Sequence, residues 1–143
     1  MPILETPPRP AQCKRGSPES KIQASCVAWM HNTYPEYRGL YFAVQNENSR
    51  ADSNASTGAI RRAVGVTKGV SDTILLIARG KWNALCVEFK TDIGRQSDAQ
   101  RLWQSRVEAQ GYRYEVVRSL EEFKKLIREY LALETTDLLT NKK

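Results

Sequence analysis

Two carboxylates and a lysine lie where one short part of this chain could bring them together. Residues 84–91 read ALCVEFKT, with Glu88 and Lys90 at alternate positions, and Asp72 ends the sequence GVSD earlier in the chain. Successive side chains of a β-strand point to opposite faces, so Glu88 and Lys90 would share one face of a strand at 84–91. The opposite face would carry apolar residues that can pack in a core, namely Leu85, Val87 and Phe89.

A divalent cation is the simplest way to hold Asp72 and Glu88 side by side. Two neighbouring carboxylates repel, and each raises the pKa of the other unless positive charge lies between them. Mg²⁺ binds a few carboxylates together with waters and phosphate oxygens. A lysine on the same face can orient a water or stabilise the charge that develops at phosphorus. The three residues therefore indicate metal-dependent hydrolysis of a phosphodiester bond.

A simpler interpretation competes with this one. Glu88 and Lys90 could be a solvated charge pair on an edge strand, and such pairs contribute almost nothing to stability. Asp72 and the segment before it favour the metal site over this alternative.

A β-hairpin would bring the three residues together. The segments 72–78 (DTILLIA) and 84–91 are both strand-like, and RGKWN between them contains a glycine suited to a turn. In an antiparallel hairpin the start of the first strand lies beside the end of the second strand. Asp72 is therefore expected close to Glu88 and Lys90.

Helices and strands alternate through the rest of the chain. SPE at 17–19 is a helix start, and S-x-x-Q at 97–100 is the capping box of a later helix that ends at Gly111. Trp29, Trp103 and Tyr130 fall at helical spacing, which favours positions in the core. The expected elements are a helix from 17 to about 33, a strand at 40–45, a short helix at 57–64, the hairpin, a helix from 97 to 110, a strand at 112–117 and a helix from 119 to about 130. This order predicts an α/β fold with a central mixed β-sheet flanked by α-helices.

Composition fits a single soluble domain with a polyanionic partner. The 143 residues are 41% hydrophobic and 27% charged, as in ordinary globular proteins, and no apolar run is long enough to cross a membrane. Lys and Arg outnumber Asp and Glu by 22 to 16, which favours nucleic acid, although a merely basic surface would show the same balance. Three cysteines and one histidine form no zinc-binding pattern.

The termini suggest the limits of the domain and its compartment. We expect a flexible N-terminal arm at 1–16, one domain at 17–132 and a frayed tail at 133–143. The N-terminal sequence MPILETPPRP lacks the features of a secretory signal. Buried, reduced thiols in a cytoplasmic protein are therefore expected.

The sequence around Asp72, Glu88 and Lys90 resembles a family of nucleases. D…E-x-K is the core of the PD-(D/E)XK nuclease superfamily. The longer frame of GVSD, VEFK, IGRQSDAQ, GY, EVV and SLEEF resembles the virus-type replication-repair nuclease domain, VRR-NUC. SPESKIQASCVAWMHNTYP and LYFAVQNENSR resemble the first helix and the strand and loop of that domain, so the resemblance extends over about residues 18–128. It implies a PD-(D/E)XK restriction-endonuclease-like core. Ser71 departs from the PD-(D/E)XK superfamily pattern, which usually has a proline there that shapes the backbone and binds nothing.

The resemblance implies roles for particular residues. Mg²⁺ or Mn²⁺ would be bound by Asp72, Glu88 and the main-chain carbonyl of Phe89, with Glu19 as an additional acidic ligand. The catalytic set would comprise Asp72, Glu88, Lys90, Glu19 and Gln100, with Lys90 as the catalytic lysine. Gln45 and Asn46 match polar positions at the end of the family's second element.

Several of these residues have simpler explanations as well. Glu19 could serve only the helix dipole, and Gln100 could serve only the capping box. The candidate DNA contacts flank the expected cleft and are Asn46, Arg61, Arg62, Lys68, Arg95 and Ser97. They could equally be solvated surface residues without a role in binding.

The resemblance implies a structure-specific DNA endonuclease without an organic cofactor. Stand-alone members of the family act as homodimers on branched DNA, including four-way (Holliday) junctions, so we expect a role in replication, repair or recombination in the cytoplasm of a bacterium or a phage-infected host. A non-catalytic DNA-binding accessory protein is one alternative, although a pure binder has no need of carboxylates near a phosphate. A restriction-type endonuclease is another, and the loop at 46–58 would have to supply its base recognition.

Overall fold

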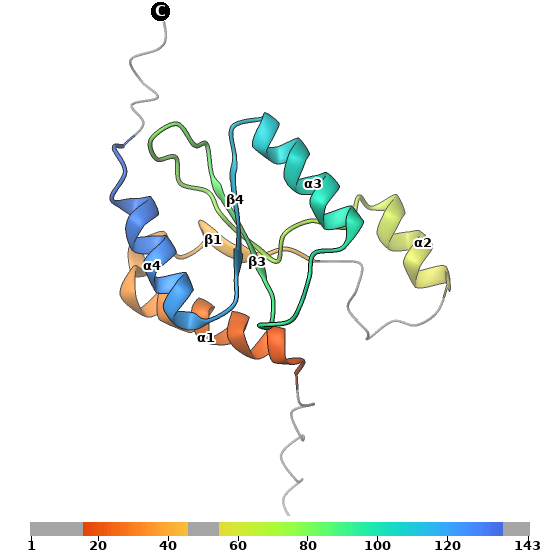
Figure 1. The fold of residues 1–143 in the computed structure, drawn as a ribbon. Helices are drawn as coiled ribbons and strands as arrows, with labels where there is room; N and C mark the ends of the chain where they lie inside the picture. Colours follow the sequence, from red (N-terminus) through yellow and green to blue (C-terminus); the bar gives the residue numbers. More distant parts are fainter. Residues whose placement is uncertain (1–15, 46–54, 136–143) are drawn as a thin grey trace, which may run out of the picture.

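The computed structural model describes residues 16–45 and 55–135, and the centre of this part is a mixed sheet in the order β1-β2-β3-β4 (Figure 1). β1 (Tyr41–Ala43), β2 (Thr73–Leu75) and β3 (Leu85–Phe89) pair in antiparallel fashion. β4 (Arg113–Val117) pairs with β3 in parallel. The predicted mixed sheet is confirmed, and β3 has a strand on each side.

The helices cover the two faces of the sheet unequally. α1 (Pro18–Thr33) and α4 (Leu120–Leu131) pack on each other and on one face, whereas α3 (Asp98–Ala109) lies on the other face (Figure 1). α3 connects the parallel strands β3 and β4, which is the usual arrangement of a βαβ unit. A 3-10 turn, η1 (Pro35–Tyr37), follows α1, and α2 (Ala55–Ala63) lies at the periphery.

The predicted N-caps of α1 and α3 are present in the structure. Ser17 accepts a hydrogen bond from the Ser20 N–H at the start of α1. Ser97 and Gln100 form the complete capping box of α3. α3 ends at Ala109, two residues before Gly111, whose positive φ of 82° explains the glycine at this position.

The core lies between the sheet and the pair α1 and α4. It combines buried side chains of both helices with the apolar face of β3, including Cys26, Met30, Leu85, Val87, Phe89, Phe123, Ile127 and Tyr130. Trp29 packs against this cluster, as the sequence predicted. Trp103 differs from the prediction, because it is half-buried on α3 and lies outside the cluster.

The strands are shorter than predicted, for a reason visible in β2. Beyond Leu75 the Leu76 N–H still bonds to the Leu40 carbonyl, but the Ile77 carbonyl accepts its hydrogen bond from the Tyr130 hydroxyl at 2.5 Å. A side chain of α4 therefore takes the place of a neighbouring strand. Sequence propensity could not reveal this contact, because its partners are far apart in the chain.

The expected arm and tail lie only partly within the described residues. Gly80 in the β2–β3 turn donates a hydrogen bond to the Glu134 carbonyl at 2.7 Å, so residues at the beginning of the expected tail lie against this turn. Residues 1–15 of the expected arm and 136–143 of the expected tail lie outside the described residues. Within the described part of the chain, each helix is too short or too polar to span a membrane.

Candidate active site

Glu88 and Lys90 are buried on an interior strand. Glu88 is 1% exposed and Lys90 is 8% exposed, and Lys90 Nζ lies 3.4 Å from Glu88 Oε1. The alternation predicted for β3 is confirmed, because its other face joins the core between α1 and α4. The interpretation as a solvated pair on an edge strand is wrong, since β3 has neighbours on both sides. Buried charges cost several kcal/mol each unless they are well paired, so these two residues are not incidental surface features.

Asp72 lies beside Glu88, as the hairpin prediction required. The register pairs Thr73 with Val87, which sets Asp72 opposite Glu88 on the neighbouring strand. Asp72 Oδ2 accepts a hydrogen bond from the Phe89 N–H at 2.8 Å. This bond fixes the position of the Asp72 carboxylate at the end of β3.

Burial opposes ionisation of both carboxylates. Desolvation raises the pKa of Glu88 well above its usual range, and the charge of Asp72 raises it further, whereas Lys90 lowers it. Desolvation also raises the pKa of Asp72, against the lowering effects of the Phe89 N–H and of Lys90. With both carboxylates ionised, the single lysine would leave the cluster with an excess of negative charge.

Gln100 connects α3 to the carboxylate of Glu88. Its Nε2 donates a hydrogen bond to Glu88 Oε1 at 2.5 Å, while its Oε1 accepts a hydrogen bond from the Ser97 N–H at 2.8 Å. The two explanations of Gln100 from the sequence are thus compatible, because one amide closes the capping box and holds Glu88. Glu88 Oε1 has two partners, and Glu88 Oε2 is buried with no hydrogen-bond partner among the described residues.

Gly69 sets the distance between the segment leading to Asp72 and the start of α3. A Cβ at this position would lie 2.5 Å from the carbonyl carbon and oxygen of Ala99 and 2.9 Å from the Gln100 nitrogen. Its φ of +83° is also unfavourable for other residues. A glycine is therefore required for the backbone before Asp72 to approach the helix that carries Gln100.

Glu19 reaches the same region from the start of α1. A Cβ at Gly94 would lie 3.3 Å from Glu19 Oε1, so this carboxylate lies over the turn that follows β3. The charge of Glu19 raises the pKa of both Asp72 and Glu88. Glu19 thus comes within electrostatic range of the two carboxylates.

The donor set suits a hard divalent cation that also binds waters and substrate. The unpartnered Oε2 of Glu88, next to a second carboxylate, offers the oxygen ligands that Mg²⁺ and Mn²⁺ prefer. Within the described residues no three His, Cys, Asp or Glu side chains gather closely enough to enclose a metal by themselves. A site of two carboxylates completed by other oxygens is typical of Mg²⁺, whereas a closed protein cage is not.

The candidate DNA contacts within the described residues belong to several different elements. Lys68 and Arg95 are exposed in the loops before β2 and after β3. Arg61 and Arg62 lie in the last turn of α2, and Ser97 caps α3. Gln45 is exposed beyond β1, and Asn46 lies outside the described residues.

Arg118 is a positioning residue that the sequence did not reveal. Its Nη1 donates hydrogen bonds to the carbonyls of Thr91 and Gly94, the latter at 2.8 Å. These bonds fasten the turn between Lys90 and α3 to the end of β4. An arginine after a strand has no distinctive local pattern, so the sequence offered no signal for this contact.

Comparisons with known proteins agree with this geometry. The model of the VRR-NUC domain family matches residues 17–121. A solved structure of a VRR_NUC domain protein has a TM-score of 0.70 and 20% sequence identity, with 85% of this chain and 94% of that chain covered. At this low identity the similarity shows that the two chains share a fold. The search of curated proteins found no match.

Proposed function

Because the chain belongs to the VRR-NUC family, a family of nuclease domains, we propose that it is a Mg²⁺- or Mn²⁺-dependent endonuclease that hydrolyses phosphodiester bonds in branched DNA. The observation that carries this proposal is the buried Glu88 carboxylate, which has one unpartnered oxygen beside Asp72 and Lys90. A fold that served only binding would gain nothing from this unbalanced, buried cluster.

The metal ligands would be Asp72, Glu88 and the main-chain carbonyl of Phe89, with Glu19 contributing from α1. When bound, Mg²⁺ or Mn²⁺ would polarise the scissile phosphate and lower the pKa of a water. The Phe89 N–H holds Asp72, and Gln100 holds one oxygen of Glu88, so the other oxygen is left available. Both carboxylates are thus oriented before any substrate arrives.

Lys90 would act on the attacking water and on the phosphate. Its ammonium group is almost fully buried and lies on the same face as Glu88. In this position it can orient the water and stabilise the charge that develops at phosphorus, and such groups act strongly where water is excluded. Gln100 would support catalysis by fixing Glu88.

The substrate would be DNA with a branch, such as a fork, a flap or a four-way junction, processed during replication, repair or recombination. The net charge of +6 supports a polyanionic partner. Arg61, Arg62, Lys68, Arg95 and Ser97 would contact phosphates, together with Asn46. The small described part contains no helix-turn-helix or zinc module for base recognition, which favours recognition of DNA shape.

Cleavage assays test this proposal directly. Purified protein is incubated with labelled four-way junction, fork, flap and linear duplex in Mg²⁺, Mn²⁺ or EDTA. We expect metal-dependent cleavage of branched DNA, which Asp72→Asn and Lys90→Met reduce by about 100-fold or more. Asp92→Asn, an exposed carboxylate in the turn after β3, and Lys125→Ala on α4 serve as matched controls that retain activity.

Two other results would replace the proposal. Tight DNA binding without cleavage in either metal would indicate a non-catalytic accessory protein. Cleavage of linear duplex at one sequence would indicate a restriction-type enzyme.

We also propose that the active form is a homodimer, since two active sites would suit paired incisions at a branch. Exposed apolar side chains such as Leu76, 51% exposed, and Phe42, 39% exposed, are compatible with self-association. Light scattering with and without junction DNA should give the mass of a dimer. A monomer under both conditions would rule this part out and leave the nuclease proposal intact.

A further inference from the structure

We propose that a groove between residues 67–68 and α3 binds an unpaired nucleotide of the DNA strand next to the cleaved phosphate, an inference that rests on the proposed nuclease function. The groove is lined by Thr67, Lys68, Ala99, Leu102, Trp103 and Arg106. Apolar side chains of α3 form its floor, and a cation lies on each side, Lys68 in the loop before β2 and Arg106 on α3.

The floor is an apolar stripe of α3 that has no role in the core. Ala99, Leu102 and Trp103 form this stripe, and the charged Arg106 follows them at helical spacing on the same face. Leu102 is 58% exposed, and Trp103 is half-buried, with its ring edge-on to Tyr114 at a centroid distance of 6.0 Å. A tryptophan held in place by a second ring and open to a groove is suited to contact with a base, which any of the four bases can make.

The described residues do not neutralise the cations of this groove. Lys68 and Arg106 are exposed, and neither forms an ion pair or hydrogen bond with another residue of the described chain. None of the lining residues is acidic. The nearest carboxylate on the same helix, Asp98, pairs with Arg101. The groove therefore favours an anionic ligand such as a phosphate linked to the bound base.

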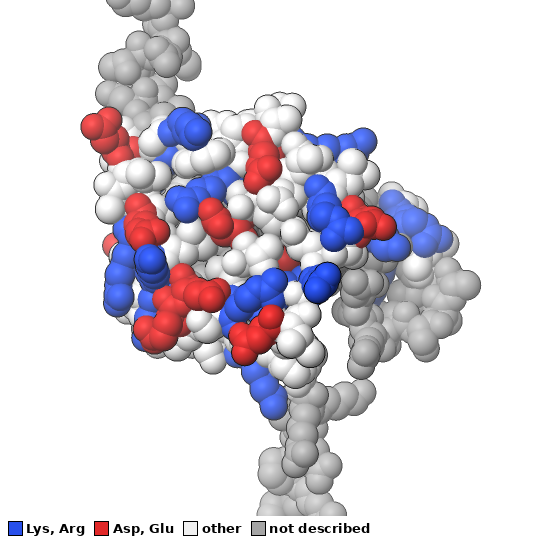
Figure 2. Space-filling model, viewed as in Figure 1, with Lys and Arg blue, Asp and Glu red and all other residues white. Residues whose placement is uncertain are grey.

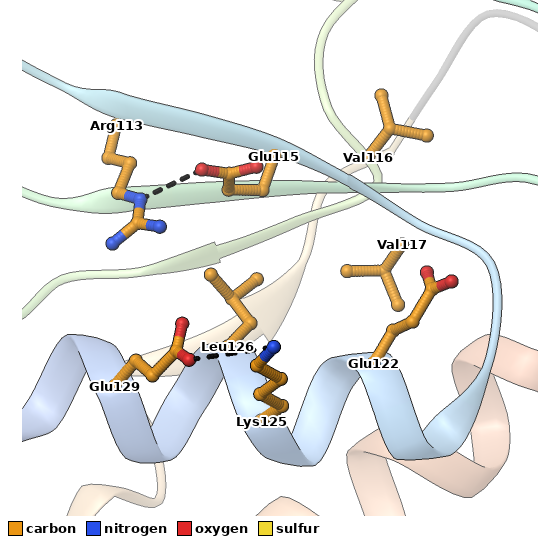
Figure 3. A pocket seen from close by; sticks show the side chains of 8 residues that line it. All are labelled: Arg113, Glu115, Val116, Val117, Glu122, Lys125, Leu126 and Glu129. Atoms are coloured by element: carbon orange, nitrogen blue, oxygen red, sulfur yellow. Dashed lines mark hydrogen bonds and ion pairs between the residues drawn. The ribbon is translucent and has the colours of Figure 1, made fainter.

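A pocket between β4 and α4 provides the contrast (Figure 3). Its two cations, Arg113 and Lys125, face three carboxylates. Arg113 Nε lies 2.9 Å from Glu115 Oε1, and Lys125 Nζ lies 3.9 Å from Glu129 Oε1. This pocket has an excess of negative charge and would repel a phosphate.

The groove lies next to the active site because both use the first turns of α3. Gln100 holds Glu88, and Trp103 lies three residues further along, a rise of about 4.5 Å. On the other wall Gly69 packs against Ala99, so Lys68 and Asp72 belong to one segment fixed on α3. A strand with its phosphate at Glu88 and Lys90 would thus place a neighbouring nucleotide in the groove.

A base can enter this groove only when it is not stacked inside a duplex. Extruding a paired base costs a few kcal/mol, and this cost is smallest for a base that is already single-stranded. The groove therefore favours forks and flaps, which carry an unpaired strand at the branch, over a fully paired four-way junction.

Equilibrium binding tests this inference without relying on cleavage. The full-length Asp72→Asn/Glu88→Gln protein keeps the shape of the site, lacks both negative charges and cannot cut. Its affinity is measured by fluorescence anisotropy for a labelled fork, a single strand, a four-way junction and a duplex of equal length. Into this background we introduce Lys68→Ala/Arg106→Ala, Trp103→Leu or the control Lys124→Ala/Lys125→Ala on α4, which removes the same charge as the first variant.

We expect Lys68→Ala/Arg106→Ala to weaken fork and single-strand binding by about tenfold or more, and Trp103→Leu to weaken it by about fivefold or more. Duplex and four-way junction binding should weaken by a clearly smaller factor, about threefold or less, because these DNAs lose only the general phosphate contact of Lys68. Lys68 and Arg106 are exposed, so their replacement leaves the fold unchanged, and a thermal melt checks Trp103→Leu.

Equal losses for fork and duplex would overturn the inference in favour of general phosphate contacts. Unchanged fork binding, or no measurable binding of a single strand by the background protein, would also overturn it. Failure of the nuclease proposal would appear elsewhere, as wild-type protein that cuts no DNA in either metal.

Discussion

Glu88, Asp72 and Lys90 form a buried cluster in which two negative charges face one positive charge. Gln100 and Lys90 contact one oxygen of Glu88, while its other oxygen has no partner among the described residues. Burial raises the pKa of both carboxylates, and their mutual repulsion raises the pKa of Glu88 further. Full ionisation of the cluster is thus unfavourable in the metal-free protein, and either a proton or a cation must offset the charge of the second carboxylate.

Removing the negative charge of Glu88 and removing the positive charge of Lys90 should therefore have opposite effects on stability. Glu88→Gln leaves Asp72 and Lys90 as a balanced pair, so we expect the free energy of unfolding in EDTA to rise by about 1 kcal/mol. Lys90→Met leaves two carboxylates without a counter-charge and should lower it by about 3 kcal/mol. Urea denaturation of both variants in EDTA measures these changes.

Metal addition supplies the control for this pair of variants. Mg²⁺ should stabilise the wild type and Lys90→Met, whereas Glu88→Gln should respond weakly, because it lacks a ligand. A loss of stability in Glu88→Gln would show that the ion pair with Lys90 outweighs the repulsion from Asp72.

Two cysteines give a second test at the level of single residues. Burial raises the pKa of the Cys26 thiol to about 12 and that of the Cys86 thiol to about 11. The folded protein keeps these protons where an unfolded chain releases them, so stability should be present below about pH 9 and fall as the pH rises above it. In a Cys13→Ser variant we expect a disulfide reagent at pH 8 to modify both thiols far more slowly in the native state than in guanidinium. Rapid modification of the native protein would contradict this burial.

At the scale of elements, α3 carries its capping box, the contact to the proposed metal ligand Glu88 and one side of the proposed nucleotide groove. Its first turn contains the capping box that orients Gln100, and the same turn is in contact with the backbone at Gly69. The position of Glu88 relative to Asp72 therefore depends on how closely the segment before β2 approaches the helix.

Gly69 and Gly65 offer a matched comparison of that approach. Both have positive φ, 83° and 93°, but a Cβ at Gly65 would meet nothing within 4 Å. Gly65→Ala should cost about 1 kcal/mol of stability from backbone strain alone. Gly69→Ala adds a clash with Ala99 and Gln100, so we expect a cost of more than about 2 kcal/mol and a further loss of cleavage rate. Equal effects of the two substitutions on melting temperature and rate would contradict the role of this contact.

The sequence predicted local features of the fold and site well. Alternation in 84–91 separated the core face of β3 from Glu88 and Lys90, and the glycine turn after β2 brought Asp72 near them. The helix starts at Ser17 and Ser97 could be predicted because each capping serine bonds to a residue only three positions further along the chain. Each of these predictions depends on neighbours in the chain.

Features that depend on distant residues could not be predicted in this way. Arg118 reaches the carbonyls of Thr91 and Gly94 across the end of the sheet, and Tyr130 takes the hydrogen bond that ends β2. Trp103 shares the helical spacing of core residues, yet α3 covers the sheet so that this side chain stays half-buried. Burial of a helix face depends on what packs against it, which spacing alone does not specify.

At the scale of the whole molecule, acidic residues accompany the basic residues of some elements and not of others. Figure 2 shows acidic side chains interspersed with basic ones over α4, whereas α2 carries Arg61 and Arg62 and no acidic residue. On α4, Lys124 and Lys125 each lie near a glutamate. Lys68 and Arg95, exposed in the loops before β2 and after β3, have no ion pair among the described residues, so they are more available to DNA than the lysines of α4.

Binding to DNA should accordingly weaken steeply with salt, and the slope should depend on where cations are removed. Each phosphate contact contributes about −0.9 to the slope of log K against log salt, so about four contacts would lower the affinity on the order of 100-fold between about 50 and about 200 mM salt. Arg62→Ala/Arg95→Ala should make this slope shallower by about 2, because both side chains are exposed and are proposed to contact phosphates. Lys124→Ala/Lys125→Ala on α4 removes the same charge and should leave the slope unchanged, since those lysines already face glutamates.

Anisotropy titrations at several salt concentrations measure the slopes of the wild type and of the two double variants. Equal changes in both double variants would mean that DNA responds to net charge alone and that α2 and the loop after β3 do not form its contact surface.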